Sequence, residues 1–219
     1  KQVILIDKNS ELGGVCLNRG CIPSKALLHL AKTIEEAKAL KQTGVTFDKP
    51  QIDLDAIRNW KDSVVNKLNK GISNLVKIRK IEVMQGTATF DSPTQLSVKN
   101  NTNNCQTITF DNCIIATGSR SSNIPGFPTG HPLIINSTGA LKLRDIPKRL
   151  LVIGGGYIGL ELGSVYNALG SKVTVVEFMP YLLPGADEDL VKPLAQKLRK
   201  SCENIYLSTN VVKVEPDKK

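Results

Sequence analysis

Aromatic residues and histidine are scarce in this 219-residue chain. Phe, Trp and Tyr together make up 5% of the residues, and only two histidines are present. A nucleic-acid-binding protein usually interleaves aromatic side chains with a basic block. Here the net charge of +9 comes from lysines that are dispersed along the chain, which favours a solvated basic surface. We therefore expect no nucleic-acid partner.

Long apolar runs are also missing. No stretch approaches the roughly 20 residues that a membrane-spanning helix needs, so we expect no membrane span. The hydrophobic content of 41% is sufficient, over 219 residues, for one large or two modest globular domains.

Cysteine is present in an odd number. Five cysteines, with no apolar secretory segment at the start of the chain, argue against an extracellular disulfide scaffold, and we expect a reducing compartment in which one pair cycles. Cys105, Cys113 and Cys202 are scattered, and we expect them to be plain core or surface residues.

The most informative pair is Cys16 and Cys21. It follows Gly13-Gly14 and precedes Ile22-Pro23-Ser24-Lys25, which begins a helical pattern that continues to Gly44. A dithiol that cycles at neutral pH needs one thiolate, and helix N-termini and nearby cations stabilise thiolates. Zinc ligands or inert buried thiols are the alternative, but zinc sites normally show a second Cys or His pair at short spacing, and none is nearby. Redox use is therefore favoured.

A second motif begins at Arg149. Residues 150–153 are a predicted buried strand that ends in Gly154-Gly155-Gly156-Tyr157-Ile158-Gly159, a helix follows over 160–169, and a second strand, 172–176, ends at Glu177. Glycine-rich turns of this spacing bring the backbone and a helix N-terminus close to a pyrophosphate, and a carboxylate about 20 residues later binds ribose hydroxyls. The pattern predicts a dinucleotide-binding unit instead of an ordinary glycine turn. Glu177 would repel a 2′-phosphate, which favours NAD over NADP.

Residues 1–7 are similar to residues 171–177 at an offset of 170. Asp7 then corresponds to Glu177. By the same logic, the glycine turn that belongs to Asp7 is expected before residue 1. The alternative is an unrelated apolar strand with a carboxylate at its end.

The remaining pattern is a long helix followed by short strands. The helix is predicted to start near Asp53 and to end near Lys80, with an apolar stripe that we expect in the core. This stripe consists of Ile57, Trp60, Val64, Leu68, Ile72 and Leu75. Strands are predicted over 81–84, 87–90, 95–98, 107–110, 113–116 and 210–214, with a turn at 103–104 and a linker over 124–132.

Several of these segments resemble one family along the whole chain. The segment Gly-Gly-x-Cys-x4-Cys-Ile-Pro-Ser-Lys, the stretch 86–90, the Ala-Thr-Gly at 116–118 and Gly-Gly-Tyr-Ile-Gly-x-Glu are similar to the flavin-dependent pyridine nucleotide-disulfide oxidoreductases. The flanking residues are most similar to the branch that oxidises dihydrolipoamide. Asp7 is a departure, because the family usually has Glu there.

The resemblance implies an α/β fold with two Rossmann-like dinucleotide-binding domains, both incomplete. Residues 1–120 would be an FAD-binding domain with an extra β-meander but without its first β-α unit. Residues 121–219 would be an NAD-binding domain that is incomplete at its C-terminal end. The central and dimer-interface domains would be absent, so we expect an internal fragment of a longer polypeptide.

The resemblance also implies the site residues and two cofactors, FAD and NAD. The implied catalytic residues are Cys16, Cys21 and Lys25, and no metal site is implied. Contacts to FAD are expected from Asp7, Gly13, Gly14, Val15, Cys16, Lys25, Ala88, Thr117 and Gly118. Contacts to NAD are expected from Gly154, Gly156, Tyr157, Ile158, Gly159, Glu161, Glu177 and Val211.

The implied reaction is NAD-dependent reoxidation of protein-bound dihydrolipoamide through a Cys16–Cys21 redox disulfide. The implied partner is the lipoyl domain of a 2-oxoacid dehydrogenase acyltransferase or the glycine cleavage carrier, and the implied enzyme is a homodimer of the bacterial cytoplasm or the mitochondrial matrix, with the cytoplasm favoured. The family's His-Glu acid–base pair is not matched by His29 or His131, so we expect the fragment alone to be inactive.

Two alternatives stay open. A related flavin disulfide reductase of the mercuric or glutathione type would share the disulfide, although the glutathione type should show basic residues in place of Glu177. A non-catalytic NAD-binding module is the other alternative for the fragment alone.

Overall fold

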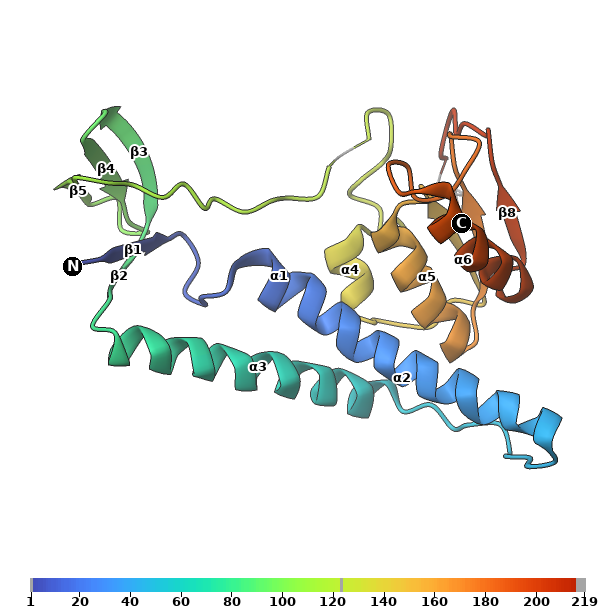
Figure 1. The fold of residues 1–219 in the computed structure, drawn as a ribbon. Helices are drawn as coiled ribbons and strands as arrows, with labels where there is room; N and C mark the ends of the chain where they lie inside the picture. Colours follow the sequence, from blue (N-terminus) through green and yellow to red (C-terminus); the bar gives the residue numbers. More distant parts are fainter. Residues whose placement is uncertain (1, 123, 216–219) are drawn as a thin grey trace.

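The computed structural model describes residues 2–122 and 124–215, and it has a mixed α/β fold (Figure 1). This confirms the predicted fold class. The elements in chain order are β1 (Ile4–Asp7), α1 (Gly14–Arg19), α2 (Cys21–Ala39), the 3-10 helix η1 (Leu40–Thr43), α3 (Leu54–Ile78), β2 (Glu82–Gln85), β3 (Thr87–Ser92), β4 (Gln95–Lys99), β5 (Cys105–Thr109), α4 (Ser137–Leu141), β6 (Arg149–Ile153), α5 (Tyr157–Leu169), β7 (Lys172–Val176), α6 (Glu188–Ser201) and β8 (Asn204–Tyr206). Among the described residues, no helix is long and apolar enough to cross a membrane.

The strands form three small sheets. β1 and β2 pair in parallel, β3, β4 and β5 form an antiparallel meander, and β6, β7 and β8 form a parallel sheet. In the last of these, Ile153 lies opposite Val176, so β6 and β7 end side by side. Two segments that the sequence separates, the glycine turn after β6 and Glu177 after β7, therefore meet at one edge of the sheet.

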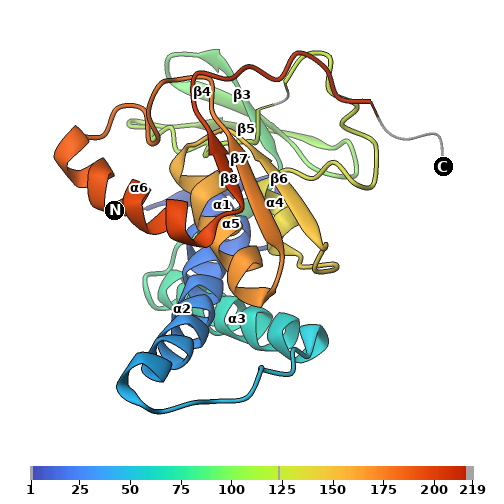
Figure 2. The ribbon, with the colours of Figure 1, turned by 90° about the vertical axis from the view of Figure 1, so that its right-hand side faces the viewer.

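The buried hydrophobic cluster joins α2, near the start of the chain, to the C-terminal half. α5 packs on β6 and β7 on one side and on α2 on the other (Figure 2). Leu27 of α2 is fully buried in this cluster together with Val165 and Val173. The helix that follows the cysteine pair is thus held by apolar contacts against the helix that follows the glycine turn, and the geometry of any site between them depends on this core.

α3 begins as predicted but buries a different face. The Asp53 carboxylate caps its N-terminus by accepting a hydrogen bond from the Ala56 N–H at 2.9 Å. The prediction that the Trp60 stripe lies in the core is wrong for Trp60, Leu68 and Leu75, which are 39%, 43% and 56% exposed. Of the stripe, Ile57 packs against the core. The buried positions are Lys61 and Val65, one residue further along. Among the helices, α3 packs mainly against α2 and α1, and the buried residues cover a narrow strip of its surface.

Two predicted strands do not form. Residues 113–116 are irregular, with Ile114 91% exposed, and residues 210–214 are irregular as well. A strand needs a neighbour to complete its hydrogen-bond ladder, and no strand pairs with either segment in the part of the chain that the structure describes. The other strands are confirmed to within two residues, and Asn103 adopts the left-handed conformation of the predicted turn. α1, α4, α6 and β8 were missed.

Tyr166, on α5, gives a prediction for alkaline pH. Its hydroxyl is buried and donates a hydrogen bond to the Ala140 carbonyl oxygen at 3.0 Å. Burial, and to a smaller extent the charge of Asp145, raises the pKa of Tyr166 above its ordinary value of 10.0. Because the folded chain holds this proton more tightly, the stabilisation is complete below about pH 10 and is lost as the pH rises through the raised pKa.

We expect Tyr166→Phe to lower the free energy of unfolding by about 1 kcal/mol at neutral pH and by less in alkali. Denaturant unfolding of both proteins between about pH 7 and pH 11 checks this, because the other titrating groups cancel in the difference. A difference that is constant across this range would contradict it.

Candidate functional site

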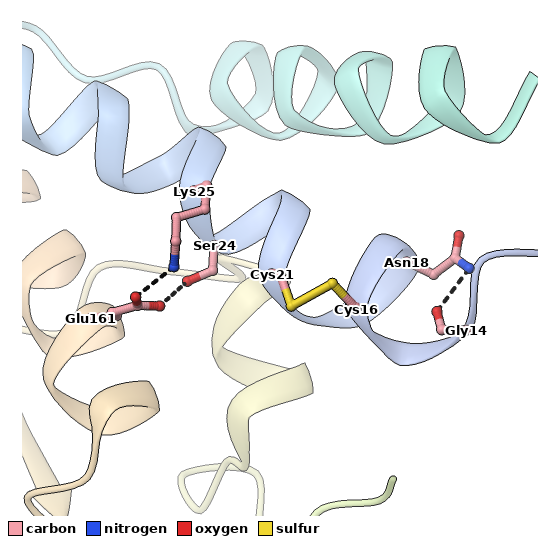
Figure 3. The surroundings of a disulfide bond; sticks show 7 residues. All are labelled: Gly14, Cys16, Asn18, Cys21, Ser24, Lys25 and Glu161. Atoms are coloured by element: carbon pink, nitrogen blue, oxygen red, sulfur yellow. Dashed lines mark hydrogen bonds and ion pairs between the residues drawn. A yellow bond between two sulfur atoms is a disulfide. The ribbon is translucent and has the colours of Figure 1, made fainter. Parts of the chain in front are cut away.

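The two cysteines of the Cys-x4-Cys motif form a disulfide at the junction of α1 and α2 (Figure 3). Their Cα atoms are 4.7 Å apart, Cys21 is the first residue of α2, and both residues are exposed. Cys105, Cys113 and Cys202 are free, and the described residues contain no cluster of His, Cys, Asp or Glu that could hold a metal ion. The disulfide therefore lies at a helix N-terminus, where a thiolate would be stabilised after reduction.

The glycine pair before the disulfide makes a turn that other residues would disturb. Gly13 has φ 100°, and a Cβ atom there would lie 2.3 Å from the Leu17 side chain. Asn18 secures the same turn, because its amide donates to the carbonyl oxygens of Leu12 and Gly14 at 3.0 Å each. It also accepts a hydrogen bond from Asn69 of α3 at 2.6 Å. Sequence reasoning missed Asn18, although its place between the two cysteines was a usable signal.

Glu161 of α5 reaches the helix that carries the disulfide. Its carboxylate accepts hydrogen bonds from Lys25 Nζ at 2.6 Å and from Ser24 Oγ at 2.9 Å (Figure 3). Ser24 is buried, whereas Lys25 is exposed. Lys25 and Glu161 were both predicted as site residues, but their pairing and the role of Ser24 were missed. No sequence signal links residues that are more than 130 positions apart.

The three glycines of the second motif that were predicted as site residues have three different environments. Gly154 has φ 103°, which favours glycine, and Gly156 precedes α5 with open space where a side chain would be. A Cβ atom at Gly159 would lie 2.8 Å from the Gly154 carbonyl oxygen and 3.0 Å from Val152. These are the features of a dinucleotide turn: a tight bend, a backbone that a pyrophosphate can approach, and close packing of helix on strand.

Glu177 is 7% exposed and lies against this turn. Its carboxylate accepts hydrogen bonds from the backbone N–H groups of Gly155 and Met179, the latter at 2.7 Å. A Cβ atom at Gly155 would lie 2.6 Å from Leu182 and 3.1 Å from the Glu177 side chain. This middle glycine of the three, which was not among the predicted site residues, therefore leaves room for the carboxylate. Each carboxylate oxygen has a further lone pair. The turn and the carboxylate therefore fit a dinucleotide with free ribose hydroxyls.

The other predicted residues are more dispersed. Asp7 ends β1 as Glu177 follows β7, and it accepts hydrogen bonds from the Asn9 N–H and amide at 2.9 and 3.0 Å. Tyr157 and Ile158 are exposed at the start of α5. No hydrogen bond among the described residues joins the remaining predicted residues to the disulfide or the glycine turn. These are Val15 in α1, Ala88 in β3, Thr117 and Gly118 in the exposed segment after β5, and Val211 beyond β8.

Comparison with known proteins assigns the family. The family model for pyridine nucleotide-disulphide oxidoreductases matches residues 1–219. The chain is 48% identical over 214 residues to dihydrolipoyl dehydrogenase of Haemophilus influenzae, covering 98% of this chain and 45% of that protein. It is 43% identical over 211 residues to mitochondrial dihydrolipoyl dehydrogenase of Pisum sativum, covering 96% of this chain and 42% of that protein.

A solved structure agrees with these relatives. The copper complex of RclA, an HOCl-induced flavoprotein disulfide reductase from Escherichia coli, superposes with a TM-score of 0.80 at 31% identity. The match covers 100% of this chain and 46% of that chain. The chain thus spans a little under half the length of the proteins that it resembles. Together with the disulfide and the glycine turn, these matches show that the chain belongs to the pyridine nucleotide-disulphide oxidoreductase family.

Proposed function

We propose that this chain is part of an enzyme of the length of its relatives, called the full-length enzyme below, which reoxidises protein-bound dihydrolipoamide with NAD. The observation that carries the proposal is the contact of Ser24 and Lys25 with Glu161. It joins the helix that begins at the disulfide to the helix that begins at the glycine turn. A disulfide and a nucleotide turn held in one packed unit suit electron transfer between a dithiol and a dinucleotide.

The proposal assigns residues 1–120 to an FAD-binding domain and residues 121–219 to an NAD-binding domain. Gly154, Gly156 and Gly159 would hold the pyrophosphate of NAD, and Glu177 would accept hydrogen bonds from its ribose. For FAD the described residues offer the carboxylate of Asp7 at the end of β1 and the turn of Gly13 and Gly14. Bound FAD would supply a two-electron carrier between the dithiol and NAD.

The chemistry of this chain's own residues is thiol–disulfide exchange. One thiolate of the substrate attacks Cys16 Sγ, so a mixed disulfide forms and Cys21 leaves as a thiolate beside Lys25 and the N-terminus of α2. The second substrate thiolate then attacks the sulfur of the mixed disulfide that belongs to the substrate. The substrate closes to a cyclic disulfide, and Cys16 and Cys21 are left as a dithiol that has gained two electrons.

The proposed partners follow from the same reaction. The substrate is the lipoyl domain of a 2-oxoacid dehydrogenase acyltransferase, or the lipoyl carrier of glycine cleavage, and the full-length enzyme is a homodimer. We place it in the bacterial cytoplasm or the mitochondrial matrix, and we favour the cytoplasm. Neither His29 nor His131 lies in the sequence context of the expected acid–base histidine, so that residue is expected outside this chain.

NAD binding by the 219-residue chain tests the nucleotide half of the proposal. Calorimetric titration should give a measurable dissociation constant for NAD and weaker binding of NADP, because the Glu177 carboxylate repels a 2′-phosphate. Glu177→Gln removes the charge and keeps an acceptor for one of the two N–H groups of Gly155 and Met179. It should weaken NAD binding about tenfold and reduce the preference for NAD over NADP. A chain that binds neither nucleotide, or is indifferent to this substitution, would contradict the assignment.

Substrate choice is tested on the full-length enzyme. Dihydrolipoamide with NAD should give rapid NADH formation, whereas glutathione disulfide or mercuric ion with NADPH should be turned over slowly. If glutathione disulfide or mercuric ion with NADPH were turned over faster than dihydrolipoamide with NAD, the proposed substrate would be wrong and the enzyme would be a related reductase.

A further inference from the structure

The end of α4 and the residues that follow it are held in an unusual way. Leu141 and Leu143 are almost completely buried, and Leu143 has a positive φ of 46°, which a leucine rarely adopts. Four backbone carbonyl groups of this segment, residues 140, 141, 143 and 144, accept hydrogen bonds from side chains of other helices. We call residues 140–144 the connector, because they lead into β6.

The donors come from two sides. From α3, Arg58 Nη1 donates to the carbonyl oxygens of Leu143 at 2.9 Å and of Arg144 at 3.2 Å, and Lys61 Nζ donates to that of Leu141 at 3.0 Å. From α5, the Tyr166 hydroxyl donates to the Ala140 carbonyl oxygen at 3.0 Å. The connector is therefore clamped between the two helices.

Lys61 is the most telling member of this set. It is only 7% exposed, although lysine is rarely buried, and it lies on the one strip of α3 that is covered. Its only other polar partner among the described residues is Asp62 at 3.0 Å. Burying an ammonium group is costly, and a charge-assisted hydrogen bond to a carbonyl group offsets part of that cost. An apolar side chain could fill this buried position without that cost. The role of Lys61 therefore lies in the hydrogen bond that it donates.

The covalent link between the two ends of the molecule cannot supply this positioning. Residues 111–122 have no regular structure and are exposed, and Figure 1 shows them as an extended trace between the β3–β5 sheet and the C-terminal half. The relative placement of α3 and the C-terminal half therefore depends on packing and on side-chain contacts. Through the clamp, α3 contacts the connector, which precedes β6 in the chain.

We propose that Arg58, Lys61 and Tyr166 are positioning residues that lock the connector and so fix the β6–α5 unit against the helices α2 and α3. The clamp thereby adds to the apolar packing of α2 on α5, which brings Glu161 to Ser24 and Lys25. The proposal concerns the placement of two parts of this chain, and it does not depend on the substrate or cofactors assigned above.

The test combines solution scattering with hydrogen exchange on the 219-residue chain. The variant Arg58→Gln/Lys61→Met removes the donors of α3, and Lys67→Met, an exposed position on the same helix, is the matched control. The amides of Lys142 and Leu143 donate to the carbonyl oxygens of Gly139 and Ala140. With the clamp open, we expect both amides to exchange about tenfold faster, because a connector that α3 no longer holds opens these hydrogen bonds more often. We also expect a broader distribution of interatomic distances with unchanged helix content by circular dichroism.

Scattering decides between positioning and local stabilisation. A distance distribution equal to that of the wild type would overturn the proposal even if exchange were faster, because it would show that the clamp only stiffens the connector. The single variant Lys61→Arg should have the same distance distribution as the wild type, since arginine keeps a cationic donor at this position. If the double variant does not fold, Tyr166→Phe removes a single hydroxyl, and an unchanged exchange rate at Leu143 in that variant would equally overturn the clamp.

Discussion

Replacement of Cys21 by serine in the full-length enzyme is expected to lower the rate of NAD reduction by dihydrolipoamide about 1000-fold or more. Cys21 is one half of the disulfide and the first residue of α2. A hydroxyl cannot form or release a disulfide, so the substrate thiols would have no electron acceptor in the chain. NADH absorbance at saturating substrate measures the rate.

The matched control is Cys113→Ser, because Cys113 is exposed and free. This variant should keep the wild-type rate. Thiol counting on the 219-residue chain checks the pairing itself: five cysteines less the two of the disulfide leave three that are alkylated without reductant, and all five are alkylated after reduction. Cys21→Ser should show four under both conditions. If Cys21→Ser kept the wild-type rate of turnover, the Cys16–Cys21 disulfide would have no part in the reaction.

The parts of the site that could be predicted from sequence are those in which the chemistry is local. The unit from β6 to Glu177 follows from strand, turn and helix periods within about 30 residues. The cysteine pair and the start of α2 are local in the same sense, because Pro23 and the apolar spacing mark a helix start. The ends of these elements differ from the prediction by no more than about three residues.

The contacts that close the site are not local. Glu161 meets Ser24 because α5 packs on α2, and a single sequence carries no record of which helices pack together. The prediction for the Trp60 stripe was wrong for the same reason. Periodicity indicates that a helix has an apolar face, but it does not indicate how much of that face other elements cover. Residues 113–116 have a strand-like sequence without a partner, and α6 contains Pro193, which obscured its helical pattern.

Alanine at Gly156 is expected to weaken NAD binding alone, whereas alanine at Gly159 is expected to lower stability as well. Gly156 has ordinary backbone angles and open space around it, so Gly156→Ala should change the free energy of unfolding by less than about 1 kcal/mol. The methyl group would stand where a pyrophosphate approaches the backbone, and the affinity for NAD should fall at least about tenfold.

At Gly159 the added methyl group meets the backbone of the turn itself. It would lie 2.8 Å from the Gly154 carbonyl oxygen, so α5 must shift away from β6, and Gly159→Ala should cost about 1 to 3 kcal/mol of stability in addition to NAD affinity. Gly71→Ala, on the exposed side of α3 with nothing nearby, controls for a generic effect of alanine and should be neutral or slightly stabilising. Denaturant unfolding and NAD titration of the three variants separate binding from packing. Equal stability losses at 156 and 159, or intact NAD binding in Gly156→Ala, would show that the open space above this turn does not receive the dinucleotide.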